Sequence, residues 1–237
     1  MTTPRGSSLG IQAWAWLGGG LFVSALTLYV WFFHTLGTPG PEGGPVAGPI
    51  LRNIALFSGF AAHHSLMARS GAKAWITRTL PPALERSAYV WMASALLIAV
   101  CLLWQRVPGQ LYALTTSAAW LGWALQGVGV VFTVAGARVL DGLDLAGIRQ
   151  TLTPVASSPI RVVWPFTLVR HPIYLGWALI VFGTPVMTLD RFVWAAVSTG
   201  YLVIAIPWEE RSLSAAAGPA YSAYQQRVRW KMVPGLY

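Results

Sequence analysis

The stretch "RHPIYLGWALIVFGTPVMTL" (residues 170–189), followed after two charged residues by "FVWAAVSTGYLVIAIPWEE" (192–210), decides the fold class. Both halves are apolar, and polar residues stand mainly at their outer ends and at the turn between them. Charge confined to the ends of apolar runs is typical of membrane spans. The stretch therefore predicts a helical hairpin with spans at Ile173–Leu189 and Phe192–Trp208. Each arm reaches only about 25 Å, so complete crossing stays open.

The rest of the chain has the same character. It is 55% hydrophobic and 10% charged, with a mean hydropathy of +0.57, whereas an average soluble domain is about 25% charged. We therefore expect an all-α polytopic membrane bundle of about six transmembrane helices, forming one domain over residues 1–237. Residues 1–140 supply the earlier spans and 141–237 the polar site. The four earlier spans are expected at Ile11–Phe33, Ile50–Met67, Ala88–Trp104 and Leu111–Val139.

The basic residues indicate an orientation. Six spans place thirteen of the 16 Lys and Arg residues on one side, which the positive-inside rule assigns to the cytosol. Because these flanking positions explain the net charge of +9, no nucleic-acid partner is expected. The thirteen are Arg5, Arg69, Lys73, Arg78, Arg86, Arg138, Arg149, Arg161, Arg170, Arg211, Arg227, Arg229 and Lys231.

Most other titratable residues fall on the same side. Four separate segments contribute to this group, and their convergence at one membrane depth is typical of a site where a water-soluble reactant meets a lipid-side one. A zinc site is not expected, because the histidines lack its ligand spacing. The residues are His63 and His64, Asp141 and Asp144, Arg170 and His171, and Glu209 and Glu210.

The opening motif predicts an anion pocket. Pro172 suits the first turn of a helix, and the N–H groups of Ile173 and Tyr174 would then face the cytosol with a partial positive charge. Gly176 lets a ligand or a neighbouring helix approach the backbone. The alternative is that Arg170 reaches lipid phosphate and His171 caps a loop.

Glu209 and Glu210 pose the opposite problem, because two carboxylates at the end of an apolar helix need compensating positive charge. Adjacent residues project about 100° apart, so at least one should face the bundle. The helix dipole is unfavourable for carboxylates at that end. The compensating cation is either Arg211 or Arg170, in an ion pair, or a cationic ligand such as an ammonium or a sulfonium.

Taken together, these motifs resemble a known enzyme group. The run Arg170-His171-Pro172 with Tyr174 and Gly176, then Glu209-Glu210 and a tail with two spaced tyrosines, is similar to the integral-membrane methyltransferases of the isoprenylcysteine carboxyl methyltransferase and phospholipid methyltransferase group. The segments "HHSLMAR" (63–69), "PPALERSAYV" (81–90) and "LDLAGIRQ" (143–150) resemble the bacterial methanethiol S-methyltransferase branch. Two departures are His63, where glutamine is expected, and the end "RWKMVPGLY", which continues past the usual proline.

The resemblance implies S-adenosylmethionine as cofactor and a small thiol as acceptor. The helix start at Pro172, with His171 beside it, would take the carboxylate of the cofactor, and Glu209 or Glu210 its ammonium or ribose hydroxyls. The remaining cofactor-binding positions are Arg170, Gly176 and Tyr174 with Tyr221 or Tyr224, whose aromatic rings would pack on adenine. The catalytic positions are His64, Arg69 and Arg149, which would lower the pKa of the thiol or take its proton.

Other acceptors and another class of protein remain open. A prenylcysteine carboxylate or a phospholipid amine are alternative acceptors, and the membrane proteins associated with nitric oxide reduction share the early "HSxMAR"-type stretch without a settled enzymatic activity. The expected partners are a small-molecule or lipid-like acceptor and membrane lipids. The resemblance to a bacterial branch implies a bacterial inner membrane, and the positive-inside rule places the active site on the cytosolic face. The sequence determines neither the acceptor nor the oligomeric state.

Overall fold

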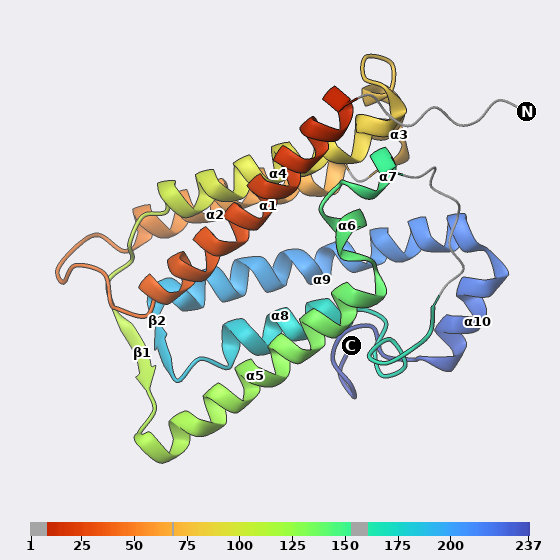
Figure 1. Cartoon of the computed structure of the whole chain (residues 1–237). Coiled ribbons are helices and arrows are strands. Elements are labelled where there is room, and N and C mark those ends of the chain that lie inside the picture. The colour runs from red at the N-terminus through yellow and green to blue at the C-terminus, as the bar shows by residue number, and fades with distance from the viewer. Residues whose placement is uncertain (1–8, 68, 153–160) are drawn as a thin grey trace, which may run out of the picture. The chain divides into compact units, whose positions relative to one another are not determined.

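The computed structural model describes residues 9–67, 69–152 and 161–237, and most of these residues are helical, with two short strands among them (Figure 1). This confirms the all-α class. The longer helices are α1 (Leu9–Thr35), α2 (Ala47–Met67), α4 (Glu85–Leu103), α5 (Thr116–Val139), α8 (Pro172–Phe182) and α9 (Leu189–Ala217). The short elements are α3 (Ser70–Ile76), η1 (Pro82–Leu84), α6 (Gly142–Leu145), α7 (Arg149–Leu152), α10 (Pro219–Arg227) and the strands β1 (Gln110–Ala113) and β2 (Val186–Thr188).

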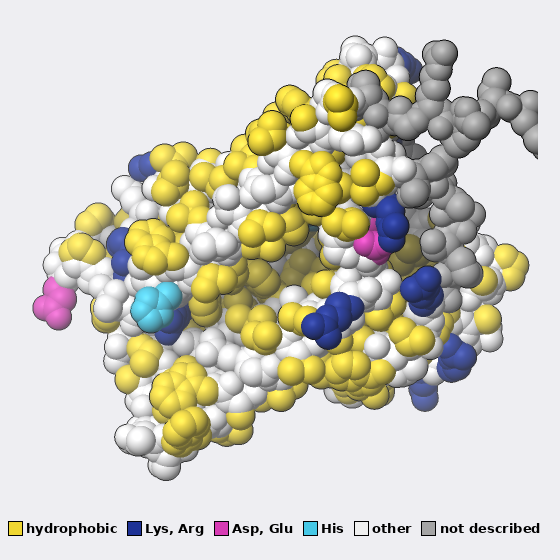
Figure 2. All heavy atoms as spheres, viewed as in Figure 1, with side chains coloured by type: hydrophobic (Ala, Val, Ile, Leu, Met, Phe, Trp, Pro, Cys, Tyr) yellow, Lys and Arg dark blue, Asp and Glu magenta, His cyan; other side chains and the backbone are white. Residues whose placement is uncertain are grey.

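Four helices of the described residues are long and apolar enough to cross a membrane. They are α1, α4 together with η1, α5 and α9. Their outward side chains are largely hydrophobic, and Figure 2 shows such side chains over much of the visible surface. An apolar surface of this extent belongs in contact with lipid. The chain is therefore an integral membrane protein, while the count of six spans stays a prediction because α2 and α8 do not meet the same criteria.

The predicted hairpin is wrong in both arms: the span predicted at Ile173–Leu189 is too long, and the span predicted at Phe192–Trp208 is too short. Helix α8 ends at Phe182, because Gly183 and Pro185 interrupt it, and its 11 residues rise only about 16 Å. Helix α9 continues to Ala217, well past the expected end at Trp208.

The fourth predicted span is wrong at its beginning. Residues 110–113 form β1, which pairs antiparallel with β2, and helix α5 begins only at Thr116. The hydroxyl of Tyr112 donates to the carbonyl of Thr184 over 3.2 Å, and the N–H of Leu114 donates to Pro185 over 2.9 Å. Strand pairing thus satisfies the backbone polar groups that the break between α8 and α9 leaves without helical partners.

The described residues fall into two compact units. The first comprises the described residues of Met1–Phe32, Ser58–Trp104 and Leu140–Ser158. The second comprises those of Phe33–Phe57, Gln105–Val139 and Pro159–Tyr237. Each unit gathers segments that are far apart in the sequence.

In the second unit, α5 lies beside α8 (Figure 1), and the two helices approach each other at glycines. Gly122, Gly129 and Gly136 recur every seven residues along α5. A Cβ atom added to Gly129 would lie 2.6 Å from the carbonyl oxygen of Gly176, and one added to Gly176 would lie 2.4 Å from Oγ1 of Thr133. Only glycine permits this approach of two helices. Gly176, predicted as a cofactor-binding residue, therefore packs against a neighbouring helix, which was the alternative expectation.

Helix α9 begins with a buried acid. Asp190 was expected in a turn, but it lies in the first turn of α9 with its side chain fully buried. Its carboxylate accepts from Nε of Arg106 over 2.7 Å and from the N–H of Val107 over 2.9 Å, and the positive end of the helix dipole also favours it there. Twenty residues separate Asp190 from Glu210 in this helix, a rise of about 30 Å, which matches the hydrocarbon core of a bilayer.

Candidate functional site

The start of α8 is held by the C-terminal segment, which we define as residues 228–237. The N–H of Arg170 donates to the carbonyl of Trp230 over 2.9 Å, and the N–H of His171 donates to that of Lys231 over 2.7 Å. Pro172 occupies the first turn of α8, as its fixed φ predicts. The N–H of Tyr174, expected to be available to an anion, donates instead to the carbonyl of His171 over 3.1 Å.

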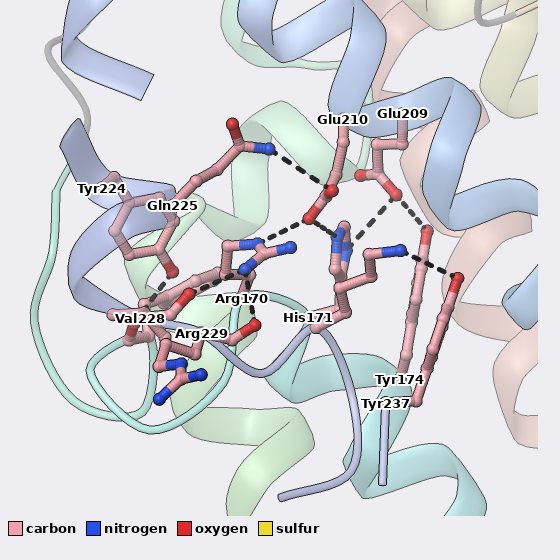
Figure 3. A network of polar contacts seen from close by, with 12 residues as sticks. Arg170, His171, Tyr174, Glu209, Glu210, Tyr224, Gln225, Val228, Arg229 and Tyr237 are labelled. Carbon is pink, nitrogen blue, oxygen red and sulfur yellow. Dashed lines mark hydrogen bonds and ion pairs between the residues drawn. The ribbon is translucent and has the colours of Figure 1, made fainter. Parts of the chain in front are cut away.

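Arg170 and Glu210 form a buried ion pair (Figure 3). Nε of Arg170 lies 2.6 Å from Oε1 of Glu210, and the two side chains are only 6% and 10% exposed. Nη1 of Arg170 also donates to the carbonyls of Val228, over 2.7 Å, and Arg229, over 2.9 Å. The structural ion pair, one of the two alternatives left open for Glu210, is therefore present, and Arg170 points into the protein rather than to lipid.

His171 lies between the two glutamates. Its Nε2 is 3.4 Å from Oε1 of Glu210, and its Nδ1 is 3.6 Å from Oε2 of Glu209. The ring of Tyr174 stacks on His171 with centroids 5.3 Å apart, and the Tyr174 hydroxyl donates to Oε2 of Glu209 over 2.8 Å. The Glu209 side chain remains 44% exposed. Of the two carboxylates, Glu209 is the one accessible to a ligand.

Neither glutamate lies at a helix end. Helix α9 runs for about two further turns after Glu210 and ends before Gly218, whose positive φ of 52° allows the chain to turn into α10. The expected penalty from the terminal helix dipole therefore does not apply to Glu209 and Glu210. The positive charge beside Glu210 is explained by burial, because a buried carboxylate needs a partner wherever it lies in a helix.

Tyr221 and Tyr224 of α10 are buried behind this ion pair. They form a cluster with Val228, packed against Val162 and Phe166. The Tyr224 hydroxyl donates to the carbonyl of Phe166 over 2.8 Å, and burial raises the pKa of Tyr224 to about 12. Both rings contact protein on their buried faces, so their predicted packing on adenine is not evident in this arrangement and stays a prediction.

The C-terminal segment closes on itself and on the core. Met232 is 2% exposed and packs with Val169, Leu175 and Ile206. The N–H groups of Met232 and Val233 both donate to the carbonyl of Tyr237. This segment is the part of the site that sequence reasoning missed. The available signal was the departure from the family pattern in "RWKMVPGLY", which continues past the usual proline.

Two polar side chains complete the network. Nε2 of Gln225 donates to Oε2 of Glu210 over 3.4 Å. Nζ of Lys231 lies 3.4 Å from the Tyr237 hydroxyl and 4.4 Å from the centre of its ring (Figure 3). Neither Gln225 nor Lys231 was singled out from the sequence, because an isolated amide and a tail lysine are common on any surface.

The three predicted catalytic residues lie in the first unit. The Tyr89 hydroxyl is 2.8 Å from Nδ1 of His64, and the guanidinium of Arg86 lies over the Tyr89 ring.

Other contacts in this unit join the remaining motif segments. Nε of Arg86 donates to the carbonyl of Asp144, and Arg149 pairs with Asp141, the N-cap of α6. Arg69 is the exposed N-cap residue of α3. The structure thus gathers the three segments that carried the more specific resemblance, while their catalytic roles stay predictions.

The comparisons with known proteins identify the family. The chain is 34% identical over 230 residues to methanethiol S-methyltransferase 2 of Bradyrhizobium diazoefficiens, which covers 91% of this chain and 88% of that protein. It is 33% identical over 190 residues to methanethiol S-methyltransferase of Mycobacterium tuberculosis, which covers 78% of each. The chain belongs to the methanethiol S-methyltransferase family.

More distant similarity extends outside this family. Nurim of Bos taurus is 26% identical over 179 residues, which covers 70% of this chain and 68% of Nurim. No protein-family model matches the chain, and no solved structure matches it. The resemblance to the methanethiol S-methyltransferase branch, which the sequence motifs indicated, is confirmed.

Proposed function

We propose that this protein catalyses methyl transfer from S-adenosylmethionine to a small thiol such as methanethiol. The observation that carries the proposal is the similarity over 91% of the chain to a protein named for that activity. When bound, S-adenosylmethionine supplies an electrophilic methyl group attached to a positively charged sulfur. The contribution of this chain is to bind that cofactor, to position the acceptor and to exclude water.

The residues at the start of α8 and along α9 fit such a cofactor. Its ammonium and ribose hydroxyls need a carboxylate, and Glu209 offers one that is held by Tyr174 and still partly exposed. The stacked rings of His171 and Tyr174 offer an aromatic surface, which suits adenine or a cationic sulfur. Glu210 contacts Arg170 and His171. Its role is therefore to hold these two residues in place, and it does not bind the ligand itself.

The acceptor must lose its proton before it reacts, because the thiolate is the nucleophile. We assign this role to His64, with Arg69 and Arg149 as positive charges that favour the thiolate. Tyr89 restrains the imidazole of His64 through its hydroxyl. Methyl transfer is an in-line displacement, so alignment and exclusion of water contribute more than the strength of any acid or base.

The proposal is tested by offering the purified protein a methyl-labelled cofactor with methanethiol, a longer thiol, a phospholipid amine and a prenylcysteine. Label is expected in the thioether product of methanethiol, detected by gas chromatography. Glu209→Gln, which keeps the shape of the side chain, should reduce this product strongly. Label only in the amine or in the carboxylate would favour the alternative acceptors, and label in none of the four would refute the proposal.

We also propose that the start of α8 faces the cytosol of a bacterial inner membrane, in keeping with the side on which the basic residues gather. Cys101 is the one cysteine of the sequence, so a Cys101→Ala background allows single-cysteine labelling. Arg229→Cys should react with an impermeant maleimide only after the cells are opened, and Glu42→Cys should react in intact cells. The reverse pattern would invert the orientation.

A further inference from the structure

We propose that Lys231 binds the carboxylate of the methyl donor, an inference that rests on the proposed function. No sequence motif indicated Lys231 as a binding residue. Two observations support this role: Arg170 and His171 already have glutamate partners, and the C-terminal segment holds Lys231 beside His171.

The two positively charged or protonatable side chains at the start of α8 have partners within the protein. The guanidinium of Arg170 contacts Glu210 and two backbone carbonyls. Both ring nitrogens of His171 face glutamate oxygens. Among the described residues, no Asp or Glu side chain forms an ion pair with Lys231. A carboxylate that enters beside His171 therefore meets in Lys231 a cation that no Asp or Glu of the described residues neutralises.

Lys231 is also held in place. Its carbonyl accepts the N–H of His171 over 2.7 Å, and the next residue, Met232, is anchored in the core. Its ammonium lies 4.4 Å from the centre of the Tyr237 ring, a cation–π geometry that orients a half-buried lysine without neutralising it. Tyr237 and Tyr174 pack on the same hydrophobic cluster, which contains Met232.

This arrangement offers a separate partner for each of the two charges of the amino-acid part of the ligand. His171 joins the two ends of the site, because its backbone bonds to Lys231 and its side chain lies beside Glu209. Glu209 is suited to the ammonium of the ligand and Lys231 to its carboxylate. Of the two N–H groups predicted to bind an anion, that of Tyr174 is used within the turn, and we therefore assign the carboxylate to the side chain of Lys231.

The test compares two ligands that differ in one group. S-adenosylhomocysteine carries the carboxylate, and S-adenosyl-3-thiopropylamine is the same molecule without it. We expect Lys231→Met to weaken binding of the first by about tenfold to a hundredfold, as for the loss of a charged hydrogen-bond partner. Binding of the second should not change. Lys231→Arg should restore most of the affinity for S-adenosylhomocysteine.

Arg229→Met is the matched control, because it removes an exposed cation two residues away and leaves intact the carbonyl that Arg170 contacts. It should change neither affinity. Equal weakening of both ligands by Lys231→Met would mean that the lysine only supports the fold, and an unchanged affinity for S-adenosylhomocysteine would mean that it does not bind the carboxylate; either result overturns the inference. Failure of the wild-type protein to bind either ligand would overturn the proposed function, and the inference with it.

Discussion

Glu209 and Glu210 are neighbours in α9, yet the structure predicts opposite consequences for their substitution. Glu210→Gln leaves Arg170 as a buried charge without its carboxylate. Loss of one partner from a buried pair typically costs about 3 to 5 kcal/mol, and we expect the lower end because Arg170 keeps two carbonyl contacts. Glu209→Gln alters a partly exposed carboxylate, so its effect on stability should stay below about 1 kcal/mol.

The assay is reversible unfolding in detergent, combined with titration of S-adenosylhomocysteine. Glu209→Gln should lose about 1 to 3 kcal/mol of ligand binding while keeping the stability of the wild-type protein. Arg170→Met should be destabilised as much as Glu210→Gln. The double variant should be less destabilised than the sum of the two single variants, because neither charge is left unpaired.

Two results would refute this reasoning. Additive destabilisation in the double variant would mean that Arg170 and Glu210 do not stabilise each other. A large loss of stability in Glu209→Gln, with ligand binding retained, would mean that the assignment of the two carboxylates is reversed.

Three further predictions concern other parts of the molecule. Gly129→Leu should destabilise the protein by about 1 to 3 kcal/mol or more through overpacking against α8, whereas Gly127→Leu, in open space on the same helix, should be tolerated in the same unfolding assay. His64→Ala should reduce thiol methylation more at pH 6.5 than at pH 9, because a base matters least when thiolate is abundant; equal losses would exclude that role. Because burial raises the pKa of Tyr224 from 10.0 to about 12, the folded state keeps a proton that the unfolded state loses. The stability present below pH 10 should therefore decline as the pH rises towards 12, and Tyr224→Phe should reduce that decline in unfolding midpoints measured against pH.

The positions of the apolar helices could be read from the sequence, because each apolar run must be covered either by lipid or by protein. Strand β1 could not. Leu111–Ala113 adjoins an apolar helix with only Leu114 and Thr115 between them, and hydropathy alone does not separate a short strand from the first turn of a span. Its identity depends on pairing with β2, whose paired residues lie 73 to 78 positions further along the sequence.

The continuation of α9 after Glu210 was not predicted, because here hydropathy falls while the helix goes on. The residues that follow it are polar or small, so hydropathy predicts an end at the membrane boundary although helix propensity does not. The sequence did predict that Arg170, His171, Tyr174, Glu209 and Glu210 belong together, and the structure places their side chains in one network. It could not choose between an ion pair and a ligand for Glu210, because that choice depends on which face of α9 meets the start of α8.

The pairing of one buried and one accessible carboxylate has a physical reason. Successive residues of a helix point about 100° apart, so a helix that directs Glu210 inward onto Arg170 directs Glu209 towards the edge of the same contact. The buried pair then fixes the rotation of α9 against α8 and the C-terminal segment, since Arg170 bonds to both. The accessible carboxylate therefore lies where the Tyr174 hydroxyl can donate to it. The same reasoning extends to Lys231, because its carbonyl accepts the N–H of His171, so the two groups proposed to bind the ligand are both positioned through His171.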